Sequence, residues 1–141
     1  SGQPTEEFYR GSVLTAGEVA FTATGETAGV NAGATTATLP AQRFEVVIRV
    51  VAVSGTGSIG FQIQESSDGS GDPYADITLS AEAPTQGLVS FAANTATFTG
   101  IGTIKLYTTA ATEAFKRVQI SAYATFTSVT AIVTCGAADV R

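Results

Sequence analysis

The sequence predicts an all-β fold, a β-sandwich or jelly roll of about eight to ten antiparallel strands with an extended N-terminal arm. Three observations carry this prediction. Apolar residues alternate with polar ones in many short segments, which is the period of a strand with one buried face. Clusters of Gly, Asn, Asp and Pro separate these segments, and no long stretch has a helical period. The hairpin predicted over residues 59–79 is the clearest example, because a dense run of turn-forming residues divides its two arms.

The composition suits one folded domain and argues against two classes of partner, nucleic acids and membranes. The chain has 141 residues, enough to bury about two-thirds of the surface that it exposes when unfolded. Charged residues make up 13% of it, about half the usual share, and the formal net charge is -5. The seven basic residues are scattered, whereas binding to nucleic-acid phosphates needs clustered Lys and Arg. No apolar run approaches the roughly 18 residues of a membrane span, so we expect no nucleic-acid and no membrane partner.

Residues 1–12 are predicted to form an N-terminal arm, and residues 13–141 a single β-sandwich domain. The arm is polar and contains Gly and Pro, which suits either a frayed terminus or a segment that docks on a neighbouring molecule. In the docking hypothesis, the contacts come from Phe8, Tyr9 and Arg10.

Short strands are predicted along most of the remaining chain. Residues 18–24 alternate apolar and polar side chains, and the Ala/Thr/Gly-rich segment 25–40 suits a loop with a short strand at residues 36–39. The same alternation predicts strands at residues 88–92, 95–99, 101–107, 115–127 and 129–135. Gly100 is expected to separate the second of these from the third. In the strand at 115–127 the inward side chains are expected to be Val118, Ile120, Ala122, Ala124 and Phe126.

The strongest strand signal runs from Arg43 to Val53. One face of this strand carries Phe44, Val46, Ile48, Val50 and Ala52. The other face is itself half apolar, so we expect the strand at the centre of a sheet with cover on much of both faces. Val47, Arg49 and Val51 on the second face are predicted to lie at a subunit or sheet interface. The alternative is that they belong to an ordinary core between two sheets.

The segment Gly55-Thr56-Gly57-Ser58-Ile59-Gly60 matches the GxGxxG pattern of dinucleotide-binding loops. In that motif a helix follows the glycines, and its N-terminus holds the pyrophosphate. Here an alternating strand follows instead. The glycines are therefore predicted to form a hairpin turn between the strand that ends at Val53 and the strand that begins at Ile59. No cofactor is expected.

The tip of the predicted hairpin, Asp68-Gly69-Ser70-Gly71-Asp72, resembles the start of a calcium loop. However, Pro73 and Leu79 occupy the positions where an EF-hand has its turn glycine and its bidentate glutamate. We therefore expect the acidic side chains to bond the backbone of their own turn, and we predict no metal site. A calcium site of another kind within residues 65–76 stays open as the alternative.

No catalytic residue is predicted. The chain has no His, so Ser-His and Cys-His nucleophiles and imidazole metal ligands are excluded. Cys135, beside Val133, is expected to be a small buried side chain, and Lys105 an outward-facing edge charge. The carboxylates show no spacing that singles out the acid and base of a glycosidase. The chain is therefore not expected to be an enzyme.

Three segments carry a resemblance to a known group of proteins. In the hairpin, Gln62-Ile63-Gln64-Glu65-Ser66-Ser67-Asp68-Gly69 is followed by Tyr74-Ala75-Asp76-Ile77. The other two are the turn at Val53–Thr56 and the late strand that reads Phe115-Lys116-Arg117-Val118-Gln119-Ile120-Ser121-Ala122. Together they resemble small β-sandwich structural proteins of tailed bacteriophages, over about residues 43–135. The inserted Gly71-Asp72-Pro73, and Tyr74 where Trp is frequent, depart from that pattern.

The resemblance implies a virion protein, made in the host cytoplasm, that decorates or cements the capsid shell by binding the major capsid protein across capsomers. The neutral surface and the half-apolar strand at 43–53 suit a protein that also contacts copies of itself, as a dimer or trimer. Two other functions stay open. One is another virion component, such as a tail-tube, head-tail connector or fibre-base protein. The other is a non-viral adhesin-like or carbohydrate-binding β module, whose marks would be an exposed aromatic cluster or a complete calcium loop.

Overall fold

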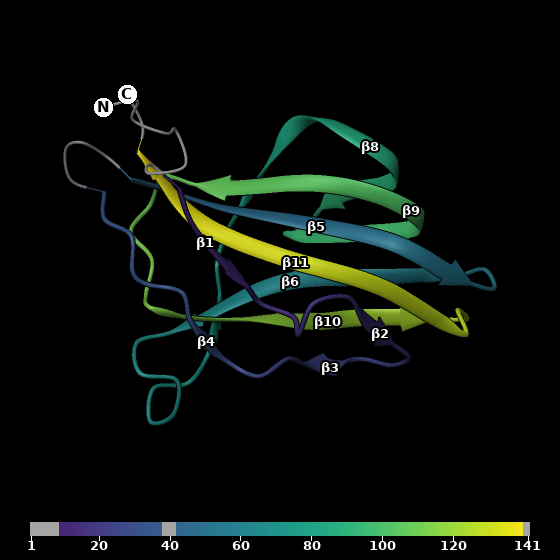
Figure 1. The fold of residues 1–141 in the computed structure, drawn as a ribbon, viewed down its shortest axis with the longest axis horizontal. Helices are drawn as coiled ribbons and strands as arrows, with labels where there is room; N and C mark the ends of the chain where they lie inside the picture. The colour runs from purple at the N-terminus through teal and green to yellow at the C-terminus, as the bar shows by residue number, and fades with distance from the viewer. Residues whose placement is uncertain (1–8, 38–41, 140–141) are drawn as a thin grey trace.

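The computed structural model describes residues 9–37 and 42–139, and every regular element in these residues is a β-strand. The strands, in chain order, are β1 (Tyr9–Val13), β2 (Val19–Phe21), β3 (Gly25–Glu26), β4 (Val30–Asn31), β5 (Gln42–Ser54), β6 (Ser58–Ser66), β7 (Ala75–Asp76), β8 (Ser80–Ala92), β9 (Thr95–Thr108), β10 (Phe115–Ala124) and β11 (Ser128–Asp139). All their pairings are antiparallel (Figure 1). The predicted all-β fold is confirmed.

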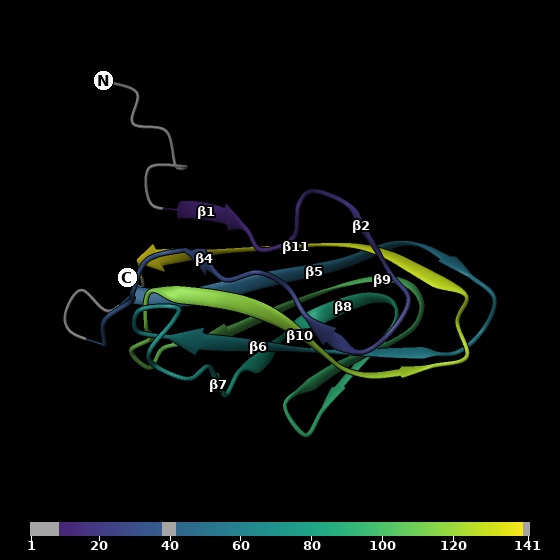
Figure 2. The same cartoon turned by 90° about the horizontal axis from the view of Figure 1, so that it is seen from below.

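The sheet curls into two layers around one apolar core. Its strands pair in the order β1-β11-β5-β9-β6-β10-β3, with β8 beside β9. Strands β11 and β5 run over β6 and β10, as Figure 2 shows. Strand β9 belongs to both layers, because its residues 102–108 pair with β5 and its residues 96–98 pair with β6. The arrangement is that of a β-sandwich whose layers share a strand.

The shared strand differs from the prediction of two strands at residues 95–99 and 101–107. The structure has one strand, β9, and Gly100 lies where its partner changes from β6 to β5. A Cβ atom at this position would come within 2.6 Å of the Leu88 side chain. Glycine therefore permits the close approach of β8 and a bend in β9 without ending the strand.

The inner face of β5 forms the centre of the core. The predicted inward residues Phe44, Val46, Ile48 and Val50 are all buried. Ala52 was expected on the same face, but it is exposed. The register between β5 and β11 shifts here, so Val51 is an extra residue that forms a β-bulge and reverses the alternation. Val53 packs against the core in place of Ala52.

A second bulge changes the alternation of β10. Its register against β6 shifts at Ser121. As a result Ala122 and Ala124, which were expected to point inward, are exposed, and Tyr123 packs against the core. The other predicted inward residues of this segment are buried, namely Val118, Ile120 and Phe126.

The predicted hairpin over residues 59–79 is present. Its arms are β6 and β7, in which Gln64 pairs with Asp76 and Glu65 pairs with Ala75. Beyond β7 the chain continues along the core, where Ile77 is buried.

The glycine-rich segment before β6 is not a hairpin turn. Residues 55–57 join β5 to β6, but these strands are not partners in the described sheet, so the predicted hairpin is wrong. The connection instead passes from one layer to the other (Figure 2). Gly55 has a φ of 84°, in the left-handed region that glycine favours. Strand β6 follows the glycines, as expected.

The chain from β2 to β4 closes one side of the sandwich. Strand β2 pairs with β11, whereas β3 and β4 pair with β10, so residues 19–31 pass from the edge of one layer to the edge of the other (Figure 1). Strand β2 corresponds to the strand predicted at residues 18–24. Of the short strand predicted at 36–39, residues 36 and 37 are not in a strand, and the rest lies outside the described residues.

Candidate interaction surfaces

The outer face of the β11-β5-β9 layer contains the residues predicted to lie at an interface. Val47 and Arg49 alternate with the core residues of β5, so their side chains lie on the face away from the core. Val47 is half-buried and Arg49 is exposed, while the half-buried Val51 forms the bulge. The alternative of an ordinary core between two sheets does not fit the exposed Arg49, and none of the three residues belongs to the core cluster of the described chain. Their role at an interface stays a prediction. The cover that was expected on this second face is not supplied by the described part of the chain.

Within residues 9–37 and 42–139, Arg49 has no ion-pair, hydrogen-bond or ring partner. Among the side chains that the structure describes, it is the only cation in this state. Arg43 and Lys105 pair with carboxylates, Lys116 donates to backbone oxygens, and Arg117 donates to a glutamine. A guanidinium presents its N–H donors in a planar fork that matches a carboxylate. The centre of this face can therefore bind a carboxylate of another molecule.

The direct cross-strand partners of Arg49 are one apolar side chain and one hydroxyl, Ile132 of β11 and Thr103 of β9. Next along β5, Val47 lies between Thr134 of β11 and Lys105 of β9, and Lys105 is already paired with carboxylates. All five of these neighbours are half-buried. Sequence reasoning did not identify the residues on β11 and β9, because a local pattern does not tell which strands become neighbours. An ion pair formed here would be partly shielded from water, which strengthens it.

A network of charges occupies one end of the same face. Arg43 Nε lies 2.8 Å from Glu45 Oε2, and Lys105 Nζ lies 3.2 Å from Glu45 Oε1. Glu82 of β8 pairs with both cations. The Arg43 guanidinium also lies 4.0 Å from the centroid of the Tyr107 ring. Two cations and two carboxylates compensate one another, so this end of the face leaves no charge for a partner. Lys105 faces outward as expected, since it alternates with the buried Ile104 and Leu106. It is not a solvated edge charge, because it is half-buried, ion-paired and on β9, which has β5 and β8 on its two sides.

The residues that carry the phage resemblance form a polar cluster beside the hairpin. Gln64 Nε2 donates to Asp76 Oδ1 at 3.0 Å and to Gln119 Oε1 at 3.3 Å. Gln64 Oε1 accepts from Arg117 Nε at 2.8 Å, and the Arg117 guanidinium lies 4.1 Å from the centroid of the Tyr74 ring. These contacts join β6, β7 and β10. The motif therefore holds three strands together, through the amide of Gln64 and its three side-chain partners.

The acidic turn bonds its own backbone, as predicted. Asp68 Oδ1 accepts from the N–H groups of Ser70 and Asp72, each at 2.9 Å, and Asp72 Oδ2 accepts from the N–H of Ser67 at 2.9 Å. The bonds from Asp72 and Ser70 lower the pKa of Asp68, because they stabilise its charged form. Among the described residues, no group of three or more His, Cys, Asp or Glu side chains is placed to hold a metal ion.

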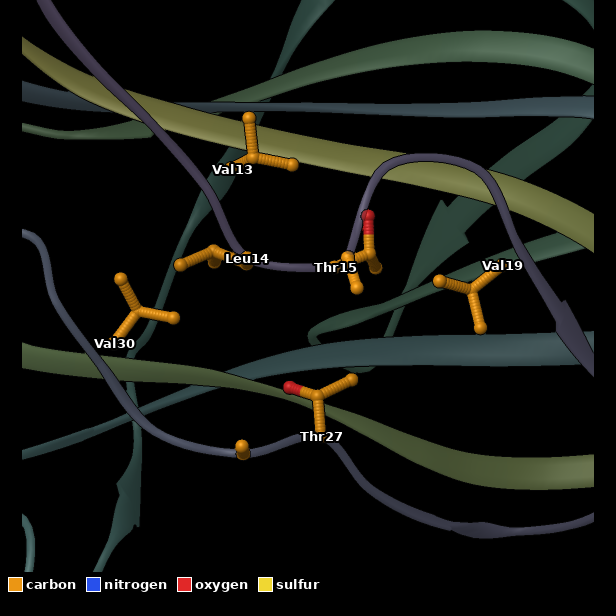
Figure 3. A pocket seen from close by; sticks show the side chains of 8 residues that line it. Val13, Leu14, Thr15, Val19, Thr27 and Val30 are labelled. Atoms are coloured by element: carbon orange, nitrogen blue, oxygen red, sulfur yellow. The ribbon is translucent and has the colours of Figure 1, made fainter.

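An apolar groove lies where β1 and β2 approach the segment that contains β3 and β4. Its volume is about 350 Å³, and its walls include Val13, Leu14, Val19 and Val30 (Figure 3). Thr27 also lines it, but its Oγ1 already accepts from the N–H of Val118 at 2.9 Å. Among the residues that the structure places, no charged side chain lines the groove. It therefore offers contact with apolar groups and no ionic recognition.

Two titratable side chains lie in the core. Lys116 shares the inner face of β10 with Val118, and it is fully buried. Its Nζ donates to the carbonyl oxygens of Gly33, at 3.3 Å, and Glu113. Burial lowers the pKa of Lys116, because an ammonium loses hydration there. Cys135 is buried as predicted, and burial raises the pKa of its thiol to about 11. Sequence reasoning missed Lys116, although its parity with Val118 was a signal.

The predicted arm is described only in part. Phe8 lies outside the described residues, as do the side chains of Tyr9 and Arg10. The backbone of these two residues belongs to β1, where Tyr9 pairs with Ala138 and Arg10 pairs with Ala137. Residues 9–12 are thus an edge strand of the sheet. Whether the arm binds a partner stays a prediction.

Comparison with known proteins identifies no family. No protein-family model matches the chain, and no curated protein matches its sequence. The crystal structure of SPBc2 prophage-derived protein YomS is similar over 91% of this chain and 92% of that one, with 11% sequence identity and a TM-score of 0.46. At that identity and score, the similarity carries no argument about function. No helix in the described residues is long and apolar enough to cross a membrane.

Proposed function

We propose that the chain is a non-enzymatic virion protein of a tailed bacteriophage that decorates or cements the capsid shell. Its partner is the major capsid protein, which it binds across capsomers on the capsid surface. The assignment to a phage rests on the resemblance of the hairpin and of the late strand to phage structural proteins. The observation that carries the binding role is Arg49, whose guanidinium lies at the centre of an outer sheet face and has no partner in the part of the chain that the structure describes.

The chemistry of this face favours a different protein as its partner over a second copy of this chain. A symmetric dimer built on the face around Arg49 would bring two unpaired guanidinium groups together, which is unfavourable. A capsid surface that presents an Asp or Glu among apolar side chains would instead pair with Arg49 and cover Val47 and Ile132. The trio first predicted as a possible subunit interface, Val47, Arg49 and Val51, is thus proposed as the contact with the shell.

The proposed mechanism is mechanical. A protein that binds across neighbouring capsomers contacts the assembled shell at more points than it contacts free capsid protein. Binding then stabilises the assembled state in proportion to that difference in affinity. The chain supplies no covalent step in this proposal.

Shells of the major capsid protein, prepared from a virus stock that lacks this protein, provide the test. Purified protein is added to the shells, and its occupancy is measured by electron cryomicroscopy. We expect regular density at fixed positions on the shell, with the β11-β5-β9 face toward the capsid. Shells that stay bare at a large excess of the protein would overturn the proposal. Density confined to the tail of complete virions would overturn the shell assignment in favour of another virion component.

A further inference from the structure

Strand β8 is a long edge strand with one neighbour. Its 13 residues, Ser80–Ala92, pair with β9, and in the described part of the sheet nothing pairs with its other side. Most of its residues are exposed. The strands at the other edges of the described sheet are much shorter, since β1 has five residues and β3 has two. An open edge of this length is a template for pairing with another chain.

The two halves of β8 differ in how they protect this edge. The first half contains Pro84 and the ion-paired Glu82, and its register against β9 shifts between Glu82 and Gln86 and again between Gly87 and Val89. Proline, charge and irregular register are the usual means by which an edge strand avoids pairing. The second half, Leu88–Ala92, has no proline and no charge, and only Leu88 lies within a register shift. It is uncharged, rich in strand-forming residues, and from Val89 onward in regular register.

The turn after β8 determines which backbone groups face the open edge. Ala93 and Asn94 have φ values of 51° and 56°, as in the two-residue turn of a tight hairpin. In such a turn the flanking residues, Ala92 and Thr95, form a hydrogen-bonded pair. Hydrogen-bonded and non-hydrogen-bonded pairs then alternate along the two antiparallel strands. Ser90 therefore bonds to β9, while the N–H and C=O groups of Val89 and Phe91 point away from it. These groups have no partner across the open edge in the described chain.

Exposed apolar side chains lie beside the same half of the strand. Among the described residues, the large apolar side chains most exposed to water are Leu88 at 60%, Ile101 on β9 at 57% and Val13 on β1 at 46%. The Leu88 side chain lies over Gly100 of β9, the residue before Ile101, because a Cβ atom built at Gly100 would come within 2.6 Å of it. A second chain paired along this edge would remove part of this apolar surface from water.

We propose that Leu88–Ala92 pairs with the same segment of a second copy, antiparallel and around a two-fold axis at Ser90. In this register Val89 lies opposite Phe91 of the other copy, so the unpaired backbone groups of both residues bond to each other. Leu88 lies opposite Ala92 of the other copy. The segment carries no charge, so nothing in it repels its own copy. This edge is distinct from the outer face around Arg49, and the inference does not depend on the proposed binding to capsids.

Sedimentation of the purified protein over a wide range of concentrations tests the proposal, with Ser90→Lys as the decisive variant. We expect the wild type to form a dimer as its concentration rises. Ser90→Lys should stay monomeric, because the non-bonded pair at the axis would bring two ammonium groups together. Thr24→Lys, at an exposed turn far along the chain, makes the same change in net charge and should dimerise like the wild type. A monomeric wild type, or a dimer that Ser90→Lys leaves intact, would overturn the proposal.

Hydrogen exchange at individual amides provides a second readout that does not rely on a variant. The amides of Val89 and Phe91 should become more protected as the concentration of the wild type rises. The amides of Ser90 and Ala92 already bond to β9, so their protection should not depend on concentration. A dimer in which the exchange of Val89 and Phe91 is the same at low and high concentration would assign dimerisation to another surface and overturn the proposal.

Discussion

The ammonium group of Lys116 lies 4.7 Å from the centroid of the Phe44 ring, in the interior of the sandwich. A buried cation is costly unless its donors find acceptors, and here the backbone carbonyls of Gly33 and Glu113 supply them. Both carbonyls belong to segments that lead into β10 or run beside it. Lys116 therefore connects the loop around residue 33 with the end of the core where Phe44 packs.

Replacing Lys116 with Met should lower the free energy of unfolding by about 2 kcal/mol at pH 7. Methionine fills a similar volume, but it leaves the carbonyls of Gly33 and Glu113 without their donor. Urea denaturation of both proteins measures the difference. Lys105→Met is the matched control, since Lys105 takes part in ion pairs near the surface, which contribute about 0 to 1 kcal/mol. A Lys116→Met protein at least as stable as the wild type would show that desolvation of the ammonium outweighs its hydrogen bonds.

Cys135 should make the protein less stable in alkali. Its thiol has a pKa of about 11 in the folded protein, against 9.0 for an unperturbed thiol. Between these values the unfolded chain has lost a proton that the folded chain keeps, so the free energy of unfolding falls as pH rises. Two pKa units correspond to about 2 to 3 kcal/mol, and the effect is complete above pH 11.

Cys135→Val, which keeps the site apolar, isolates this contribution. Denaturation of the wild type and the variant from pH 7.5 to 11 gives the two stability profiles. Their difference should change in the variant's favour as pH rises. Taking the difference removes most of the contribution of Lys116, whose pKa is lowered by burial and acts in the opposite sense. It does not remove all of it, because the charge of Cys135 in turn raises the pKa of Lys116. Parallel profiles over this range would show that the thiol titrates alike in the folded and unfolded chains.

Asn94 fastens the β8-β9 turn to the chain that follows β7. Its Oδ1 accepts from the N–H of Leu79 at 3.0 Å, and its Nδ2 donates to the carbonyl of Ile77 at 2.9 Å. Asn94→Ala should cost about 2 to 3 kcal/mol, because it removes both bonds and places Ala at a φ of 56°. Asn94→Gly loses the bonds but tolerates the backbone, so it should be the more stable of the two variants in thermal denaturation. Equal stability of the two would show that the backbone conformation contributes little.

Local patterns predicted the strands well and their neighbours poorly. Alternation identified β5, β6, β10 and β11, because burial of one face imposes a period of two on each strand. It failed after Val51 and Ser121, where a single extra residue reverses the alternation without a mark in the sequence. The alternation also predicted two strands where the structure has one, β9. Gly100 interrupts the alternating pattern, but the strand continues through it while its partner changes from β6 to β5.

For the candidate surface around Arg49, too, one part could be predicted from the sequence and another part could not. The placement of Val47 and Arg49 opposite the core face followed from their positions in the strand. That Arg49 is unpaired while Arg43 is paired depends on which strands lie beside β5, namely β9 with Lys105 and, beyond it, β8 with Glu82. Such pairing across strands is a property of the fold and is not visible in a single sequence.

The effect of deleting the arm on stability should depend on the residue at which the deletion ends. Deleting residues 1–8 leaves every residue of β1 in place. Deleting residues 1–12 removes the strand that pairs with residues 135–138 of β11, so we expect a further loss of about 1 to 2 kcal/mol in the free energy of unfolding. Thermal denaturation compares the two. If the arm docks through Phe8, the shorter deletion alone should reduce occupancy on shells, and unchanged occupancy would contradict that hypothesis.

Arg49→Gln should weaken binding to capsid shells about 10-fold to 100-fold, because a hydrogen bond to a charged group contributes about 1.5 to 3 kcal/mol. The fold should be unaffected, since Arg49 is exposed and has no partner within the described chain. Arg49→Lys keeps the charge but loses the planar fork, so its affinity should lie between those of Arg49→Gln and the wild type. Binding curves on purified shells at fixed ionic strength measure all three. Thr24→Glu makes the same change in net charge as Arg49→Gln at an exposed turn, and it should bind like the wild type. If Arg49→Gln binds as tightly as Thr24→Glu, the outer face of β5 is not the surface that meets the shell.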